Sequence, residues 1–156
     1  MYRVLTAAAA AAAFALTAVP PASAAPSVAL PGVSAPVGSK LLGDEIVAPD
    51  GSRLSVGPKL YDDCTSGWVC LYADANWGGR MLRFSDYYKG NLKDWGFNDQ
   101  MSSWRNNGGS VAKWFMHDHG TWGNPCYTIA AYAASSFVGA AENDTASAIE
   151  VSNWAC

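Results

Sequence analysis

The sequence predicts an all-β fold, a sandwich of two Greek-key motifs with little helix, over residues 61–156. From residue 61 onward, short runs of aromatic and β-branched residues are separated by clusters of Gly, Asn and Asp. Such evenly spaced short runs are typical of antiparallel sandwiches. No segment shows a sustained 3.6-residue apolar period, and the same turn and aromatic residues recur later in the chain.

The apolar runs define the expected strands, and the turn residues between them define their ends. A single helical turn is expected at residues 92–97. Turns are expected at the Gly- and Asn-rich clusters 76–79, 107–109 and 122–124. The expected strands are residues 68–73, 80–84, 102–106, 112–117, 126–132 and 147–152.

An internal repeat supports two related halves, residues 61–109 and 110–156. One offset, 45 residues (122 minus 77), aligns six identical positions without a gap. Because they fall on turn residues and aromatics, a repeated backbone explains them. Units of this size are too small for separate cores, so we expect the halves to share one. The aligned pairs are Trp77-Gly78 with Trp122-Gly123, Tyr87 with Tyr132, Asn98-Asp99 with Asn143-Asp144, and Ser102 with Ser147.

The N-terminus predicts export. A charged start is followed by the uncharged run Val4 to Ala18 and the small-x-small sequence Ala22-Ser23-Ala24, which predicts a signal peptide at residues 1–24. The run is shorter than the roughly 20 residues that cross a bilayer, so we expect a secreted, extracellular protein without a membrane partner. Residues 25–60 are rich in Pro and Gly and predict a flexible arm or propeptide, although 41–42 and 45–47 could form a docked edge strand.

Composition narrows the function further. The net charge of −3 and the lack of a basic cluster exclude a nucleic-acid partner. Four cysteines in an exported chain predict two disulfides, for which three pairings exist. There is no Gly-x-Ser-x-Gly turn, and His117-Asp118-His119 lacks the further ligands that zinc needs. We therefore expect that the protein is not an enzyme. As a separate expectation, we take it to be a monomer.

Two segments at the same offset predict calcium sites. Asn98-Asp99-Gln100-Met101-Ser102-Ser103 resembles the calcium motif of the βγ-crystallins, and Asn143-Asp144-Thr145-Ala146-Ser147-Ala148 resembles it except at its last position. Calcium favours this mixture of carboxylate, carbonyl and hydroxyl oxygens. The resemblance implies that calcium is held by a side chain of Asn98 or Asp99, the Gln100 carbonyl and the Ser102 hydroxyl. Asn143 or Asp144, the Thr145 carbonyl and Ser147 would repeat the set.

The resemblance also implies that each ion bridges the two halves near an aromatic corner. Tyr72 and Trp77 form such a corner in the first half, with Asp74 nearby. In the second half the spacing places His117 where Tyr72 stands, with Asp118 nearby. The alternative is that Asn-Asp and Ser only form a turn with their own backbone.

The segment from Cys64 to Tyr72, together with Asp74 to Gly79 and Phe97 to Asp99, is similar to the bacterial βγ-crystallin-like proteinase inhibitors of the Streptomyces metalloproteinase inhibitor type. This resemblance implies a Cys64 to Cys70 bridge, which leaves Cys126 with Cys156. It implies an inhibitor of an extracellular protease, stabilised by calcium and disulfides. The short disulfide-closed loop that the family presents in its second half is missing here, so its reactive site cannot be carried over.

Two segments are candidates for the loop that contacts the protease. One is Thr65, Ser66, Gly67, Trp68 and Val69, pinned by the implied bridge; the other is the turn 116–121. A pre-organised loop binds a cleft at low ordering cost. The alternative function is a calcium-binding βγ-crystallin module without inhibitory activity, with a surface, toxin-like or carbohydrate-binding role.

Overall fold

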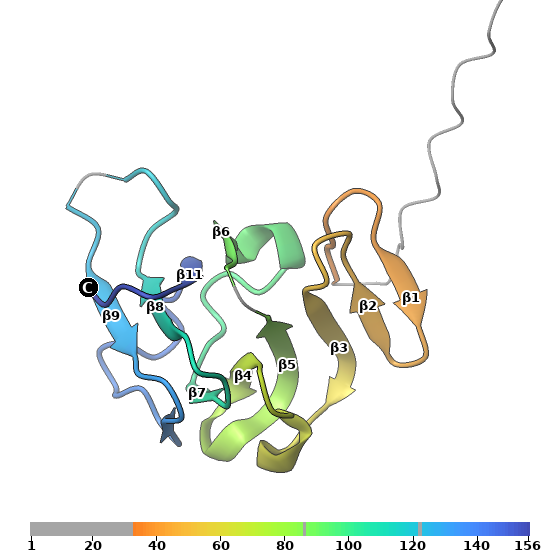
Figure 1. Ribbon diagram of the computed structural model, residues 1–156, viewed down its shortest axis with the longest axis horizontal. Coiled ribbons are helices and arrows are strands. Elements are labelled where there is room, and N and C mark those ends of the chain that lie inside the picture. Colours follow the sequence, from red (N-terminus) through yellow and green to blue (C-terminus); the bar gives the residue numbers. More distant parts are fainter. Residues whose placement is uncertain (1–32, 86, 122) are drawn as a thin grey trace, which may run out of the picture.

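The computed structural model describes residues 33–85, 87–121 and 123–156. Its strands form two antiparallel sheets, with strand orders β1-β2-β3-β5-β4-β7-β10 and β6-β11-β8-β9 (Figure 1). The predicted signal peptide and Trp122 lie outside the described residues. The strands are β1 Lys40–Leu42, β2 Glu45–Val47, β3 Arg53–Pro58, β4 Val69–Asp74, β5 Gly78–Phe84, β6 Lys89–Asn91, β7 Ser103–Asn106, β8 Val111–Phe115, β9 Cys126–Ile129, β10 Ala134–Ser135 and β11 Ala148–Ser152.

The two predicted Greek keys are confirmed by this topology. β4, β5, β6 and β7 form the first key, and β8, β9, β10 and β11 form the second. The third strand of each key forms hydrogen bonds with a strand of the other key. β6 of the first key pairs with β11, and β10 of the second key pairs with β7. All six predicted strands are present, within a few residues of their expected ends. The helical turn is the 3-10 helix η3 Leu92–Trp95, and two further 3-10 turns are η1 Tyr61–Asp63 and η2 Ala75–Trp77.

The duplication is visible in the backbone. Tyr87 and Tyr132 have φ of 58° and 54°, and Asp99 and Asp144 have φ of 53° and 55°. A positive φ is uncommon for residues other than Gly. Its occurrence at two pairs of residues that are aligned by the repeat shows that the two halves follow the same path.

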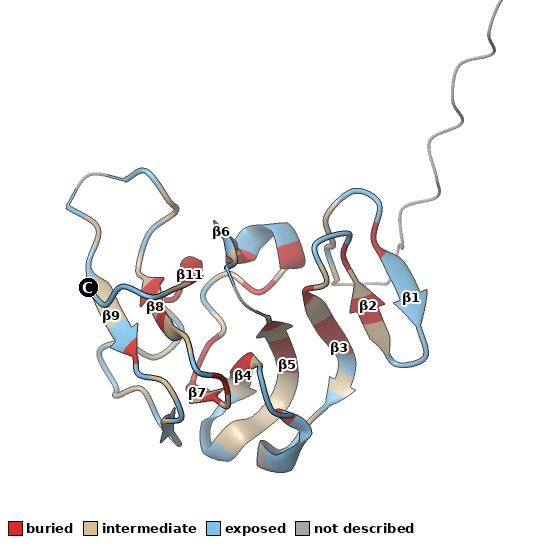
Figure 2. Cartoon of the chain, in the orientation of Figure 1, coloured by how far each residue is buried: buried red, intermediate tan, exposed pale blue. Residues whose placement is uncertain are grey.

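One apolar layer fills the space between the sheets. Leu54, Leu82 and Leu71 face it from adjacent strands β3, β5 and β4, and each is fully buried. Trp114 of the other sheet faces the same core and stacks on Tyr127 of β9, with ring centroids 4.1 Å apart. The segment after β6 contributes Trp95, which is also fully buried. Figure 2 shows buried segments, in red, on strands of both sheets.

For residues 40–58, the structure has docked strands, the alternative that the sequence analysis left open at 41–42 and 45–47 beside a flexible arm. Residues 40–58 form β1, β2 and β3, which extend the first sheet beyond β5. Ile46 and Leu54 are fully buried against that sheet. The segment has few apolar residues, but β5 already offers a hydrogen-bonding edge and a hydrophobic face. A few well-placed side chains are therefore enough to order it.

A second, smaller cluster lies on the outer face of the first sheet. Side chains alternate across a strand, so the neighbours of the inward-facing leucines point outward. Tyr72 and Met81 do so, and they are covered by the Cys64–Cys70 bridge, with Trp68 and Trp77 at the margin. This cluster fixes the segment before β4 onto the sheet. Within the described residues, no helix is long and apolar enough to cross a membrane.

Candidate functional site

The two predicted calcium motifs lie next to each other, and each reaches into the other. Ser147 Oγ donates a hydrogen bond to Asp99 Oδ1 at 3.2 Å, and Ser102 Oγ donates to Asp144 Oδ1 at 3.5 Å. The main chains cross in the same way, because Asp99 N donates to the Ala146 carbonyl and Asp144 N donates to the Met101 carbonyl. The carboxylate of each motif thus lies with the serine of the other, rather than with its own serine.

The local backbone explains why each carboxylate points toward the serine of the other motif. Asp99 and Asp144 have left-handed backbone conformations, which Asp tolerates better than most residues. Asn98 Nδ2 donates to Asp99 Oδ2, and Asn143 Nδ2 donates to Asp144 Oδ2, both at 2.7 Å. Each carboxylate therefore uses one oxygen within its motif and turns the other toward the neighbouring serine.

Each serine is anchored beside the strand end of its own half. Ser102 N donates to the Tyr72 carbonyl at 3.0 Å, and Ser147 N donates to the Phe115 carbonyl at 2.8 Å. Phe115 is therefore the structural counterpart of Tyr72, and the assignment of His117 to that place was wrong. The turn that follows β8 is longer than the one that follows β4, which shifts the repeat at this point.

Two surface hollows, of about 460 and 340 Å³, adjoin the second motif and share His117 and Ser147. The carboxylates of Asp99 and Asp144 both line the smaller one. In the larger one, Lys93 forms an ion pair with Asp118, and this hydrogen bond raises the pKa of the Lys93 ammonium above its ordinary value. Asp118 therefore lies close to Ser147 of the second motif, as predicted. Its carboxylate is already paired with the Lys93 ammonium.

The donor set suits a hard cation. Each crossed pair offers one carboxylate and one hydroxyl, and the Met116 carbonyl oxygen lies 2.9 Å from Ser147 Oγ as a second acceptor for its single proton. Asn143 Oδ1 is buried and has no hydrogen-bond partner among the described residues, so it is an acceptor without a donor. Among the residues that the structure describes, no three or more His, Cys, Asp or Glu side chains form a group of the kind that holds zinc.

The side chains of Gln100 and Thr145, whose main-chain carbonyls are the predicted ligands, have protein partners, and so do the two histidines. The Gln100 side chain contacts Arg80 and donates to the Gly96 carbonyl, and Thr145 Oγ1 donates to the Glu142 carbonyl at 2.7 Å. His119 places a ring nitrogen 2.9 Å from the Ile149 carbonyl. The turn 116–121 is therefore fastened to the domain rather than free.

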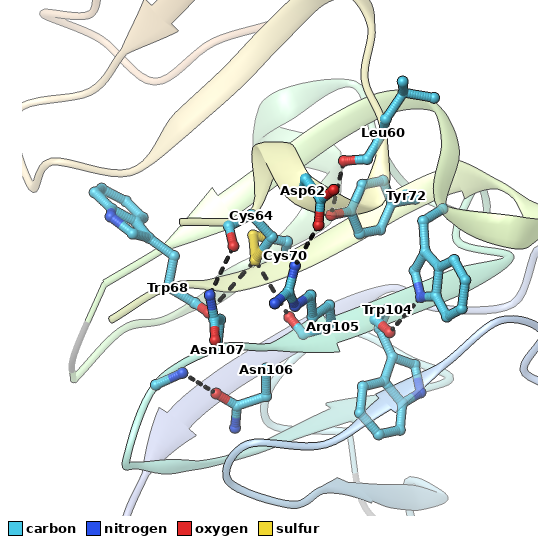
Figure 3. Close-up of a disulfide and its surroundings, with 12 residues drawn as sticks. Leu60, Asp62, Cys64, Trp68, Cys70, Tyr72, Trp104, Arg105, Asn106 and Asn107 are labelled. Atoms are coloured by element: carbon cyan, nitrogen blue, oxygen red, sulfur yellow. Dashed lines mark hydrogen bonds and ion pairs between the residues drawn. A yellow bond between two sulfur atoms is a disulfide. The ribbon is translucent and has the colours of Figure 1, made fainter. Parts of the chain in front are cut away.

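The first candidate loop is closed by the Cys64–Cys70 disulfide (Figure 3). Thr65, Ser66 and Gly67 are exposed, whereas Trp68 is half-buried and Val69 is buried at the start of β4. The exposed part of the predicted five-residue loop is therefore its first three residues. The second pairing, Cys126–Cys156, is also confirmed.

Asn107 fastens both ends of this loop. Its main chain donates to the Trp68 carbonyl and accepts from Gly67 N, each at 2.8 Å, and its side chain donates to the Cys64 carbonyl at 2.9 Å. Figure 3 shows the side chain directed at Cys64. The sequence indicated only a turn at 107–109, because an Asn-Gly-Gly cluster does not reveal a distant partner.

One protein-family model matches part of the chain. Residues 57–129 match the model of peptidase inhibitor family I36. The I36 match runs from the end of β3 to the end of β9, so it includes the Cys64–Cys70 loop and the first calcium-type motif. It confirms the resemblance stated from the sequence, and it points to a non-catalytic inhibitor rather than an enzyme.

Comparison with solved structures gives matches to βγ-crystallin domains, and the first of them shares the fold of this chain. A structure from work on the evolution of the eye lens βγ-crystallin domain fold is 18% identical with a TM-score of 0.52, and the match covers 62% of this chain and 96% of that one. A βγ-crystallin domain from Flavobacterium johnsoniae is 25% identical (TM-score 0.45, 53% and 91% covered). A βγ-crystallin from Ciona intestinalis is 24% identical (TM-score 0.45, 55% and 99% covered). The comparison with curated proteins gave no match.

Proposed function

We propose that the chain is a secreted inhibitor of an extracellular metallopeptidase, which it blocks by placing the Thr65-Ser66-Gly67 tip in the substrate cleft. The observation that carries this proposal is the I36 match over residues 57–129. The loop supports it, because a disulfide and Asn107 hold both ends while the tip remains exposed. A loop that is already ordered loses little entropy on binding.

Replacing a residue of the tip should weaken inhibition strongly without unfolding the protein. Ser66→Arg adds a long charged side chain at an exposed position, so the folded state should change by less than about 0.5 kcal/mol. We expect the wild-type protein to inhibit a thermolysin-like peptidase at near-stoichiometric ratios and to remain uncut, and the variant to inhibit at least about tenfold less, a loss of 1.4 kcal/mol in binding.

The matched control is Thr121→Arg, at an exposed position of the other candidate loop. Titration of the peptidase with both variants compares the two loops directly. Unchanged inhibition by Ser66→Arg, together with a loss in Thr121→Arg, would move the contact to residues 116–121. Failure of the wild-type protein against metallo-, serine and cysteine peptidases alike would reject the inhibitor.

We propose in addition that calcium stabilises the domain at the two crossed pairs. Asp99 with Ser147 would hold one ion, and Asp144 with Ser102 the other. The crossed carboxylates and the unpartnered Asn143 Oδ1 support this proposal. The main-chain carbonyls of Gln100 and Thr145 remain predicted ligands. Because each ion would join the two halves, its effect would be on stability. A calcium module without inhibitory activity is the second candidate function, and the same pairs favour it.

Calcium should raise the melting temperature of the wild-type protein and not that of Ser102→Ala/Ser147→Ala. For an affinity of about 10⁻⁴ M, within the range of extracellular modules, millimolar calcium stabilises the folded chain by about 1.4 kcal/mol per site. Thermal unfolding with calcium or with chelator measures this increment. Ser39→Ala/Ser55→Ala is the control, since it also removes two buried hydroxyls but lies in the first-sheet extension. An increment that survives in Ser102→Ala/Ser147→Ala would contradict the assignment.

A further inference from the structure

Trp68, the fourth residue of the candidate inhibitory loop, is held by two arginines of neighbouring strands. The Arg83 guanidinium lies 4.8 Å from the centroid of the Trp68 ring, and that of Arg53 lies 5.8 Å from it. A cation within about 6 Å of an indole face is attracted by it, and more strongly where water is excluded. The side chain of Arg83 is only 13% exposed, so this contact is largely shielded from solvent.

The two arginines need a shared anion. Arg53 and Arg83 are directly opposite each other on β3 and β5, where like charges repel. Glu45 of β2 neutralises both, because its Oε2 lies 2.8 Å from an Arg83 nitrogen and 3.1 Å from an Arg53 nitrogen. Its side chain is only 12% exposed. The Nε atoms of both arginines are buried without a hydrogen-bond partner among the described residues, so Glu45 is the contact that offsets their burial.

The position of Trp68 sets the position of the tip. Thr65, Ser66 and Gly67 are exposed, so few side-chain contacts of their own define their conformation. They are joined to Trp68 through the chain and through the hydrogen bond from Trp68 N to the Thr65 carbonyl, at 3.3 Å. The main chain at both ends of the loop is also held by Asn107 and by the disulfide. The Trp68 side chain is the side-chain connection of the loop, and it contacts Arg83 of β5 and Arg53 of β3.

We propose that Glu45, Arg53 and Arg83 are positioning residues for the inhibitory loop, and that they act through Trp68. This inference rests on the proposed inhibitor function. It gives β2 and β3 a role in binding the peptidase without contact with it, and it extends the functional unit N-terminal to the I36 match, which begins at residue 57. The extension also distinguishes these strands from a propeptide, whose removal would leave inhibition intact.

Glu45→Gln and Trp68→Ala test the proposal, with Trp68→Phe as the conservative replacement that keeps a ring under the guanidinium groups. The control is Glu150→Gln, which breaks a comparable contact, Lys113 to Glu150 at 3.2 Å, in the other sheet. Two quantities are measured for each protein. One is the inhibition constant for a thermolysin-like peptidase, and the other is hydrogen exchange at the amides of Gly67 and Trp68.

Glu45→Gln and Trp68→Ala should weaken inhibition about tenfold and accelerate exchange at both amides, as expected for the loss of a shielded cation–π contact. Compared with Trp68→Ala, Trp68→Phe should recover most of the inhibition and most of the protection from exchange. Glu150→Gln should change neither the inhibition constant nor the exchange rates. A fall in melting temperature in Glu45→Gln with unchanged inhibition and unchanged loop exchange would overturn the proposal. If the wild-type protein inhibits no peptidase, the inhibitor function fails, while the exchange rates still decide whether Glu45 positions the loop.

Discussion

Leu54→Ala should lower the free energy of unfolding by about 2–5 kcal/mol, the usual cost of truncating a buried leucine. Leu54 lies on β3, in the segment that composition alone assigns to a flexible arm, and its side chain is fully buried. It packs beside Leu82 of β5, its direct partner across the sheet. Because Leu82 faces the main core, the cavity would open into the centre of the domain. Chemical denaturation of the oxidised protein measures the change.

Leu41→Ala is the matched control, since it removes the same atoms from β1. Leu41 is 45% exposed, so the same truncation should cost well under 1 kcal/mol. Equal small effects at both positions would mean that β1–β3 detach easily from β5, and that the arm predicted from composition is the better description of the chain in solution. A large effect at Leu54 alone establishes these strands as part of the domain.

The parts of the fold that the sequence predicts well are those where the pattern is local. The six expected strands carry alternating or continuous apolar side chains, and the turns between them carry Gly and Asn. The repeat was detectable because Tyr87 and Asp99, like their counterparts Tyr132 and Asp144, keep a left-handed backbone that restricts the residue type. Local chemistry and backbone geometry agree at these positions, so one sequence was sufficient.

The strands that the sequence does not predict depend on pairing partners that are far away in the sequence. β6 and β10 contain only small and polar residues, Lys89-Gly90-Asn91 and Ala134-Ser135, and they become strands because the opposite half offers an edge. β3 has the same origin, as it adds to an edge that β5 leaves open. Hydrogen bonding to an existing sheet edge supplies the order that side-chain pattern does not show.

The same limitation applies to the candidate site. The motifs predicted which residues gather, but the carboxylates cross between halves, and only the packed structure pairs Asp99 with Ser147. Equating His117 with Tyr72 failed because the loop after β8 is longer, and a fixed offset cannot follow an insertion. Trp68 was placed at the start of an expected strand and in the candidate loop, but its neighbours in sequence do not reveal its contact with Arg83 of β5, which in turn pairs with Glu45 of β2.

The disulfide pairing, implied by family resemblance, gives the other large expected effect. Replacing both Cys126 and Cys156 by Ser should lower the free energy of unfolding by about 3–4 kcal/mol, the loop-entropy estimate for a closure of this length. The bridge joins the first residue of β9 to the end of the chain, over a sequence separation of 30. Cys156 is exposed and Cys126 is half-buried, so serine fits both places with little effect on the folded state.

The location of this loss distinguishes it from a packing defect. Residues 153–156 are exposed and make few contacts, such as the hydrogen bond from Cys156 N to Thr128 Oγ1 at 3.2 Å. The variant should therefore keep the native spectrum and its inhibition while its denaturation midpoint falls. Replacing Cys64 and Cys70 by Ala provides the contrast. Their loop is shorter, with a separation of 6, but both are fully buried beside Tyr72 and Met81, so packing is lost along with entropy. A midpoint unchanged by loss of the Cys126–Cys156 bridge would show that the C-terminal segment is already confined in the unfolded chain.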